Sequence, residues 1–373
     1  MDVNLRIPGP TPCPDDVLEA MGRQMINHRG PEFAELLERV TDGLKLLFQT
    51  EHDVLILTAS GTGAMEAMVV NTLSPGDRVL AVSIGAFGDR FGSIAETYGA
   101  GVERLSFEWR TAADPEAVAQ ALEQDDSYRA VLVTHNETST GVTNDLEAIA
   151  SAIRRVRPDV LILVDAISSL GSLPCAVDAW DLDVVATGSQ KGWMVPPGLA
   201  MVSVGPRGWQ AFERAKMPRF YFDFGRARDF LTKRQTPWTP AVSIFYALDV
   251  SLQHLVEEGV EGIVARHRRL GELTRREVKA LGLKLFADER FASNTVTAVR
   301  VPEGVQGSAL TKMLREEYQV VVAGGQGKLA GQIFRIGHLG WAAEEDIQAA
   351  IEALRGALPR LGYALPEATS RAG

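Results

Sequence analysis

The chain has 373 residues, 46% of them hydrophobic, which is enough for a large interior divided between two domains in close contact. A formal net charge of −10, with no long basic block, argues against a nucleic-acid or membrane-surface partner. The two cysteines, Cys13 and Cys175, are too few for a disulfide framework and lack metal-ligand spacing. Since no apolar run reaches the length of a signal peptide or a membrane span, we expect a soluble, cytoplasmic protein.

The N-terminal segment, residues 1–14, contains four prolines and a glycine. These residues rule out a regular helix or a central strand and favour an extended arm that lies across the body of the protein. A helix capped by Asp15 or Asp16 is expected to follow and to end at Met25, and a second helix is expected over residues 31–48.

From residue 53 onward, short apolar runs alternate with helical patterns. Strands are expected at 54–57, 78–82, 102–107, 130–134, 161–164 and 184–186, with helices at 64–73, 115–123 and 146–156. This alternation predicts an α/β fold with a mostly parallel sheet covered on both faces, and ligands at the carboxyl ends of its strands. A further strand at 199–204 is expected at an edge of the same sheet.

The remaining third of the chain predicts a different arrangement. Residues 217–240 are rich in aromatics, arginine and proline and show poor periodicity, as expected of a functional or interfacial loop. A smaller α+β domain follows from helices at 241–259, 260–281, 308–318 and 344–358 and strands near 284–286, 294–301 and 333–337. The expected division is an N-terminal arm (1–20), a large domain (21–255), a small C-terminal domain (256–365) and a tail (366–373) predicted to be disordered.

Two predicted strands are followed by a carboxylate and by an amine, which are expected to lie at the same end of the sheet. The run 161–164 ends in Asp165, and the run 184–186 leads through Thr-Gly-Ser-Gln to Lys191. Taken singly, Asp165 could cap a turn and Lys191 could be a surface cation. Together they indicate a Schiff-base site, because pyridoxal 5'-phosphate (PLP) needs a lysine to hold its aldehyde and often an acid to keep its ring nitrogen protonated.

The segment Ser60-Gly61-Thr62-Gly63 lies where a strand is expected to meet the start of a helix. Unpaired backbone N–H groups and hydroxyl donors at such a place suit a phosphate, and glycine lets the phosphate oxygens approach closely. On its own the segment is also an ordinary turn and helix cap.

These motifs occur together in a known family. From the arm at 7–12 to Arg335-Ile336-Gly337, the chain resembles the class V aminotransferases of the fold-type I PLP enzymes, in the branch of alanine–glyoxylate and serine–pyruvate or serine–glyoxylate aminotransferases. The most specific motif is Gly188-Ser189-Gln190-Lys191 followed by Pro196-Pro197-Gly198; the motifs at 60–63, 137–141 and 164–165 follow the family's order. The resemblance implies a large domain with a mostly parallel, seven-stranded type of sheet and a smaller C-terminal α+β domain.

The resemblance also implies roles for individual residues. Lys191 would hold PLP and act as general acid–base, and Asp165 would keep the ring nitrogen protonated. The phosphate would be bound by Ser60, Gly61, Thr62 and Gln190, and the ring would lie between Phe87 and Ile167, near Thr138. From the residue alone, Phe87 could equally be a core phenylalanine.

Arg335 matches the arginine that holds the substrate carboxylate, and Gly9 would lie near the same substrate. A surface arginine is the alternative interpretation of Arg335. Since the family's members are homodimers in which a loop of the neighbouring subunit reaches the phosphate, the matching loop here is 235–240. In that loop Thr236 is a better match than Thr239.

We therefore expect a PLP-dependent, ping-pong aminotransferase that moves an amino group between alanine or serine and glyoxylate or pyruvate. No motif places a second arginine for a dicarboxylate side chain, so aspartate and glutamate are expected to be poorer donors unless Arg6 or Arg29 turns toward the pocket. Two alternatives remain: a PLP-dependent lyase or aldolase, and a non-catalytic subunit that retains the fold.

Overall fold

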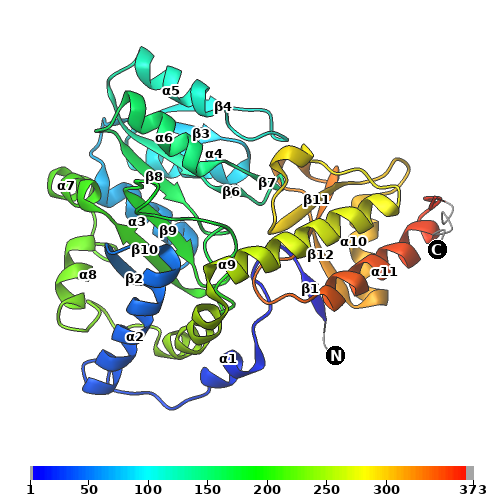
Figure 1. The fold of residues 1–373 in the computed structure, drawn as a ribbon, viewed down its shortest axis with the longest axis horizontal. Coiled ribbons are helices and arrows are strands. Elements are labelled where there is room, and N and C mark those ends of the chain that lie inside the picture. Colours follow the sequence, from blue (N-terminus) through cyan, green and yellow to red (C-terminus); the bar gives the residue numbers. More distant parts are fainter. Residues whose placement is uncertain (1–2, 367–373) are drawn as a thin grey trace.

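A seven-stranded sheet forms the centre of the larger part of the molecule (Figure 1). The computed structural model describes residues 3–366. The strands lie in the order β2 (Asp53–Ala59), β10 (Gly198–Val204), β9 (Val184–Gly188), β8 (Leu161–Asp165), β5 (Tyr128–Thr134), β3 (Arg78–Ser83) and β4 (Gly101–Ser106). The five strands from β9 to β4 are parallel, which confirms the predicted α/β fold with a mostly parallel sheet.

Strand β10 lies inside this sheet, antiparallel to both β2 and β9, so the expectation of an edge strand at 199–204 is wrong. Six of its seven residues are buried, as expected of a strand with neighbours on both sides. The edges are β2 and β4 instead.

Helices cover both faces of the sheet, because successive strand residues point to opposite sides. On one face, Leu80 and Val82 of β3 belong to a core that also takes residues from α2 (Pro31–Phe48), α5 (Pro115–Gln124) and α6 (Leu146–Val156). On the other face, Val79 and Ala81 belong to a core with α3 (Gly61–Thr72), α4 (Ala86–Thr97), α7 (Pro206–Arg214) and α8 (Phe224–Leu231).

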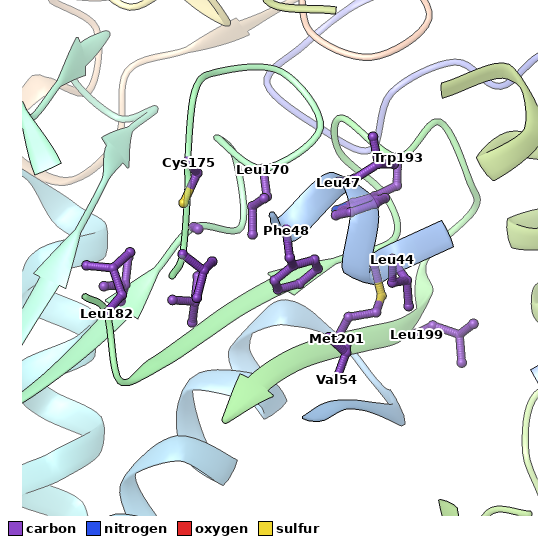
Figure 2. Packing of buried hydrophobic residues seen from close by; sticks show 14 of the residues in the cluster. Leu44, Leu47, Phe48, Val54, Leu170, Cys175, Leu182, Trp193, Leu199 and Met201 are labelled. Carbon is purple, nitrogen blue, oxygen red and sulfur yellow. The ribbon is translucent and has the colours of Figure 1, made fainter. Parts of the chain in front are cut away.

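Trp193 belongs to the first of these cores, where Figure 2 shows it beside Phe48 and Leu47. Its ring stacks on Phe48 with 5.8 Å between centroids, and its indole N–H donates to the Thr187 hydroxyl at 2.9 Å. Trp193 is fully buried there. It anchors the segment after Lys191 to the core.

The smaller part contains a four-stranded sheet in the order β1 (Asn4–Arg6), β12 (Val320–Gly324), β13 (Ile333–Gly337), β11 (Val296–Arg300). It packs with α10 (Gly307–Tyr318) and α11 (Glu344–Arg360). Helix α9 (Val242–Ala280) runs from the larger part into the smaller part (Figure 1) and is interrupted at Gly259, where φ is 71° and ψ is 157°. The interruption separates two helical segments at the boundary that the sequence predicts.

Several short elements differ from the predictions. Helix α1 (Asp15–Ala20) begins after Pro14 with no side-chain cap and ends well before Met25, because Gly22 follows and glycine is a poor helix former. The expected irregular loop at 217–240 contains α8, which Asp223 caps by accepting the Arg226 N–H at 2.8 Å. No strand forms at 284–286, where Leu285 makes a single bridge to Val299.

Four short elements complete the architecture: strands β6 (Asn136–Glu137) and β7 (Val142–Thr143), and 3-10 turns at Glu289–Phe291 and Gly327–Leu329. Within residues 3–366, no helix is both long enough and apolar enough to cross a membrane. Of the predicted disordered tail, residues 367–373 lie outside the described residues.

Candidate active site

One cavity of about 190 Å³ lies at the carboxyl ends of the parallel strands. Nine residues that the sequence analysis singled out line it: Ser60, Gly61, Thr62, Phe87, Thr138, Asp165, Ile167, Gln190 and Lys191. The other four lining residues are Met65, Arg90, Asn136 and Ser168. The topology therefore brings together side chains that are up to 131 residues apart in the chain, from Ser60 to Lys191.

Lys191 is held in the cavity wall by the N-terminal arm. Its Nζ donates a hydrogen bond to the Pro8 carbonyl, while the Thr11 hydroxyl donates to the Lys191 carbonyl at 3.0 Å. A Cβ added at Gly9, whose φ is +133°, would lie 2.5 Å from the Lys191 Nζ. Only glycine lets the arm pass this close to the amine.

Burial lowers the pKa of the Lys191 ammonium from 10.5 to about 8, because the charged form loses its hydration. The Asp165 carboxylate opposes this change, and the Arg335 and Arg90 guanidinium groups add to it. The lowered pKa increases the uncharged fraction of the amine near neutral pH, which favours its use as a nucleophile and proton carrier.

Asp165 stands at the end of β8 and is buried. Its Oδ1 accepts the Ile167 N–H at 3.0 Å, and its Oδ2 accepts the Thr134 hydroxyl at 3.4 Å. Burial raises the pKa of this carboxyl from 3.8 to about 7, and the charge of Glu137 adds to the rise, while the Ile167 N–H and Lys191 oppose it. Because its pKa is raised, the Asp165 carboxylate accepts a proton, or a hydrogen bond from a protonated ligand atom in the cavity, more strongly than an exposed aspartate does.

The N-terminus of α3 forms another part of the cavity wall. Ser60 precedes the helix without capping it by its side chain, so the first backbone N–H groups remain available. A Cβ at Gly61 would lie 2.6 Å from the Ile167 side chain, so glycine is required for α3 to pack this closely. The Gln190 side-chain oxygen is buried without a hydrogen-bond partner among the described residues.

Arg335, in β13, lies next to this wall rather than among the lining residues. Its Nε and Nη2 donate to the Gly324 carbonyl at 2.9 and 2.7 Å, and its Nη1 donates to the Thr138 carbonyl at 3.0 Å. Burial lowers the pKa of Arg335 to about 10, and the charge of Glu137 opposes that change. Neutral carbonyls orient this guanidinium without neutralising it.

The family model described as aminotransferase class-V matches residues 3–338 of the chain. The chain belongs to this family.

Three relatives illustrate the range of names in and around the family. A protein of Synechococcus sp. called soluble hydrogenase, small subunit, is 48% identical over 96% of this chain and 94% of its own length. An L-aspartate–glyoxylate aminotransferase of Paracoccus denitrificans is 38% identical (90% and 85% covered), and a serine–glyoxylate aminotransferase of Arabidopsis thaliana is 36% identical (96% and 91%). Among solved structures, an alanine–glyoxylate aminotransferase from Nostoc sp. superposes with a TM-score of 0.92 at 31% identity, over 96% of both chains.

Class V aminotransferases use PLP, and the cavity fits that cofactor. The uncapped start of α3 suits the phosphate, the Lys191 amine suits the aldehyde, and Asp165 suits the ring nitrogen. When bound, PLP supplies an electron sink for the α-carbon of an amino acid.

Thr236 does not reach this cavity within its own protomer. Its hydroxyl donates to the Trp238 carbonyl at 2.8 Å, and Arg29 donates to the carbonyls of Thr236 and Pro237 at 2.5 and 3.2 Å. Any role of Thr236 at a phosphate therefore concerns the site of a second protomer.

No motif indicates a second arginine for a dicarboxylate side chain, but the structure places Arg90 among the lining residues. Its guanidinium lies over the Phe87 ring, 4.7 Å from the centroid, one helical turn further along α4. Arg6 and Arg29, the arginines expected to turn toward the pocket, are held elsewhere, since Arg6 is buried against Asp346 at 3.5 Å. The spacing of three residues from Phe87 could have indicated Arg90 once a helix had been predicted there.

Trp193, two residues after Lys191, does not line the cavity. It packs in the core behind Lys191, as described above.

Proposed function

We propose that this class V aminotransferase transfers an amino group between a small neutral amino acid, alanine or serine, and a small oxo acid, glyoxylate or pyruvate. The observation that carries the proposal is the meeting of the Lys191 amine and the Asp165 carboxylate in one cavity, beside an Arg335 that carbonyls orient but do not neutralise. The names of the Arabidopsis and Nostoc relatives support the substrate class.

Each residue has a separate task in this proposal. Arg335 binds the substrate carboxylate, which fixes the orientation of the α-carbon bonds. Lys191 would hold the cofactor through its amine, and the free amine would take the proton from the α-carbon. Asp165 holds a proton at the ring nitrogen. The donor leaves as an oxo acid before the acceptor enters, which is a ping-pong sequence.

We also propose that the working unit is a homodimer located in the cytoplasm, with Thr236 of each protomer reaching the phosphate site of the other. An exposed aromatic stack next to this loop supports the dimer: Phe220 and Tyr221 are 65% and 44% exposed, and both stack on Trp238.

Within each protomer we propose an arm (1–20), a large domain (21–255) and a small domain (256–365). The break in α9 at Gly259 supports the last boundary.

The test is an activity matrix of amino donors against oxo acids on the purified, PLP-loaded protein. Alanine or serine with glyoxylate or pyruvate should give the highest kcat/KM, and Lys191→Ala should abolish turnover. Aspartate and glutamate should be poorer by roughly a hundredfold as long as Arg90, whose guanidinium lies over the Phe87 ring, does not pair with the second carboxylate. That carboxylate would then lose its hydration in the pocket without compensation. If aspartate is the best donor, as in the name of the Paracoccus relative, the neutral-donor proposal is wrong. Loss of that preference in Arg90→Gln would then assign the second carboxylate to Arg90.

A second candidate, a non-catalytic subunit that retains the fold, is favoured by the name of the Synechococcus relative. The two candidates differ in one result. A protein that is purified alone, binds PLP and catalyses no transamination with any pair of the matrix would support the second candidate.

A further inference from the structure

Glu137, the second residue of β6, is a buried carboxylate that none of the roles above uses. Its Oε2 accepts the N–H groups of Phe87 and Gly88 at 2.9 and 3.1 Å. Its Oε1 accepts the N–H and the hydroxyl of Ser139 at 3.1 and 2.6 Å. A carboxylate offers about four lone-pair positions, so these four donors occupy all of them and favour the anion. Burial acts in the opposite direction and raises the pKa of Glu137.

This carboxylate replaces a helix cap at the start of α4. Gly85, the residue before the helix, has no side chain with which to cap it, and the first N–H groups of any helix lack partners inside the helix. Glu137 accepts two of these N–H groups, and the Ser139 hydroxyl accepts that of Ala86 at 3.0 Å. A Cβ at Gly85 would overlap the Glu137 side chain. The backbone of Phe87, whose ring lines the cavity, is therefore fixed by a residue 50 positions away.

Glu137 also stabilises the turn that follows it, through its backbone carbonyl as well as its carboxylate. The Glu137 carbonyl accepts the N–H groups of Thr140 and Gly141 at 3.2 and 2.9 Å, which closes the turn over residues 137–141. Thr138 lies in this turn, lines the cavity, and accepts the Arg335 Nη1 at 3.0 Å through its carbonyl. Glu137 thus links the position of Phe87 to that of Thr138 and, through it, to Arg335.

We propose that Glu137 is a positioning residue of the active site: its buried carboxylate joins the start of α4 to the turn 137–141, and so holds Phe87 and the Arg335 contact in place for PLP and substrate. The inference rests on the proposed roles of Phe87 and Arg335. The charge of Glu137 also raises the pKa of Asp165. Glu137 therefore also influences the carboxylate that is proposed to hold the proton at the ring nitrogen.

A double-mutant cycle on PLP affinity tests this inference. The dissociation constant of PLP would be measured for the apoprotein with Glu137→Gln, with Phe87→Leu and with both changes. Glu137→Gln keeps the shape but places an amide NH2 against N–H or O–H donors, so PLP should bind roughly tenfold to a hundredfold more weakly, as expected for one or two lost charge-assisted hydrogen bonds. Phe87→Leu should then cost less in the Glu137→Gln background than alone.

Two results would overturn the inference. One is a PLP affinity of folded Glu137→Gln within about twofold of the unmodified protein, and the other is a double mutant whose loss is the product of the single losses. The matched control is Asp145→Asn, which weakens an exposed cap of α6 (Ala148 N–H, 3.0 Å) and should leave PLP affinity unchanged. If Glu137→Gln does not fold, Ser139→Ala removes one donor of the same carboxylate, and an unchanged affinity in that variant would reject the role.

The KM of the amino donor gives a second measurement that a loss of fold stability alone would not change. Because Thr138 carries the Arg335 contact, Glu137→Gln should raise this KM as well as lower kcat. The cycle depends only on PLP binding and not on the donor. An unmodified protein that binds PLP but catalyses no transamination would therefore reject the proposed function, while the cycle would still decide the role of Glu137.

Discussion

Lys191 can be tested through its own titration. Because the uncharged amine is the form that attacks an aldehyde, the rate of PLP capture by the apoprotein should follow the uncharged fraction. With a pKa lowered by burial to about 8, the rate should rise with pH and level off above about pH 8. Below that pH it should change by roughly tenfold per pH unit, as for a single titrating group. Stopped-flow absorbance from pH 6 to 10 would measure the profile, and a rise that continues to pH 10 would contradict the lowered pKa.

Asp165 can be tested by removing its charge and keeping its shape. Asp165→Asn should bind PLP but slow the chemical step by roughly a thousandfold, equivalent to about 4 kcal/mol, because a neutral amide cannot hold the ring proton. Single-turnover kinetics with alanine would separate this step from product release. Thr134→Val, which removes only the hydroxyl at 3.4 Å from Asp165, is the matched control with a much smaller expected effect. Near-normal turnover in Asp165→Asn would reject the proposed role.

At the scale of elements, the interruption of α9 depends on one residue. The φ of 71° and ψ of 157° at Gly259 lie in a region that is nearly exclusive to glycine. Gly259→Ala should therefore lower the free energy of unfolding by about 1–3 kcal/mol. Gly262→Ala, three residues further on in regular helix, should be neutral or should raise that free energy by up to about 1 kcal/mol. Denaturant titration of both variants would measure the difference; equal effects would show that the backbone strain has been overestimated.

The helices and strands that were predicted correctly are determined by residues close together in the sequence, whereas a helix that was missed, α4, depends on a distant residue. Strands β3, β5 and β8 are continuous runs of buried β-branched and aliphatic residues, and α6 has an apolar face with Asp145 as its cap. Helix α4, by contrast, begins with Ala86-Phe87-Gly88 and contains a second glycine, and its cap is the side chain of Glu137, 50 residues further along. No local pattern contains that information.

The same distinction holds within the site. Lys191 and Asp165 follow predicted strands, so strand order alone places them near each other, and the family motifs indicated most of the other lining residues. Arg90 and Asn136 also line the cavity, but neither the residues next to them in the sequence nor a family motif indicated this. The internal position of β10 was missed because a buried apolar run does not specify which strands flank it.

For the whole molecule, the proposed homodimer leads to a test of association. Phe220 and Tyr221, both exposed, stack on Trp238 and form an aromatic surface beside the loop 235–240. Phe220→Asp should shift the unit toward monomers and weaken PLP binding in parallel, since Thr236 would no longer reach a second site. Light scattering over a dilution series, with the PLP affinity measured on the same samples, would test both effects. A fully active monomer at assay concentration would contradict the proposal.

The small sheet carries two groups that contact residues of the cavity wall. Arg335 lies in β13, the Pro8 carbonyl that contacts Lys191 follows β1, and both strands are hydrogen-bonded to β12 (Figure 1). Because these strands belong to one sheet, we expect any displacement of that sheet to carry Arg335 and the arm together. A displacement of this sheet would therefore separate the carboxylate-binding arginine and the backbone acceptor of the Lys191 amine from the large sheet at the same time.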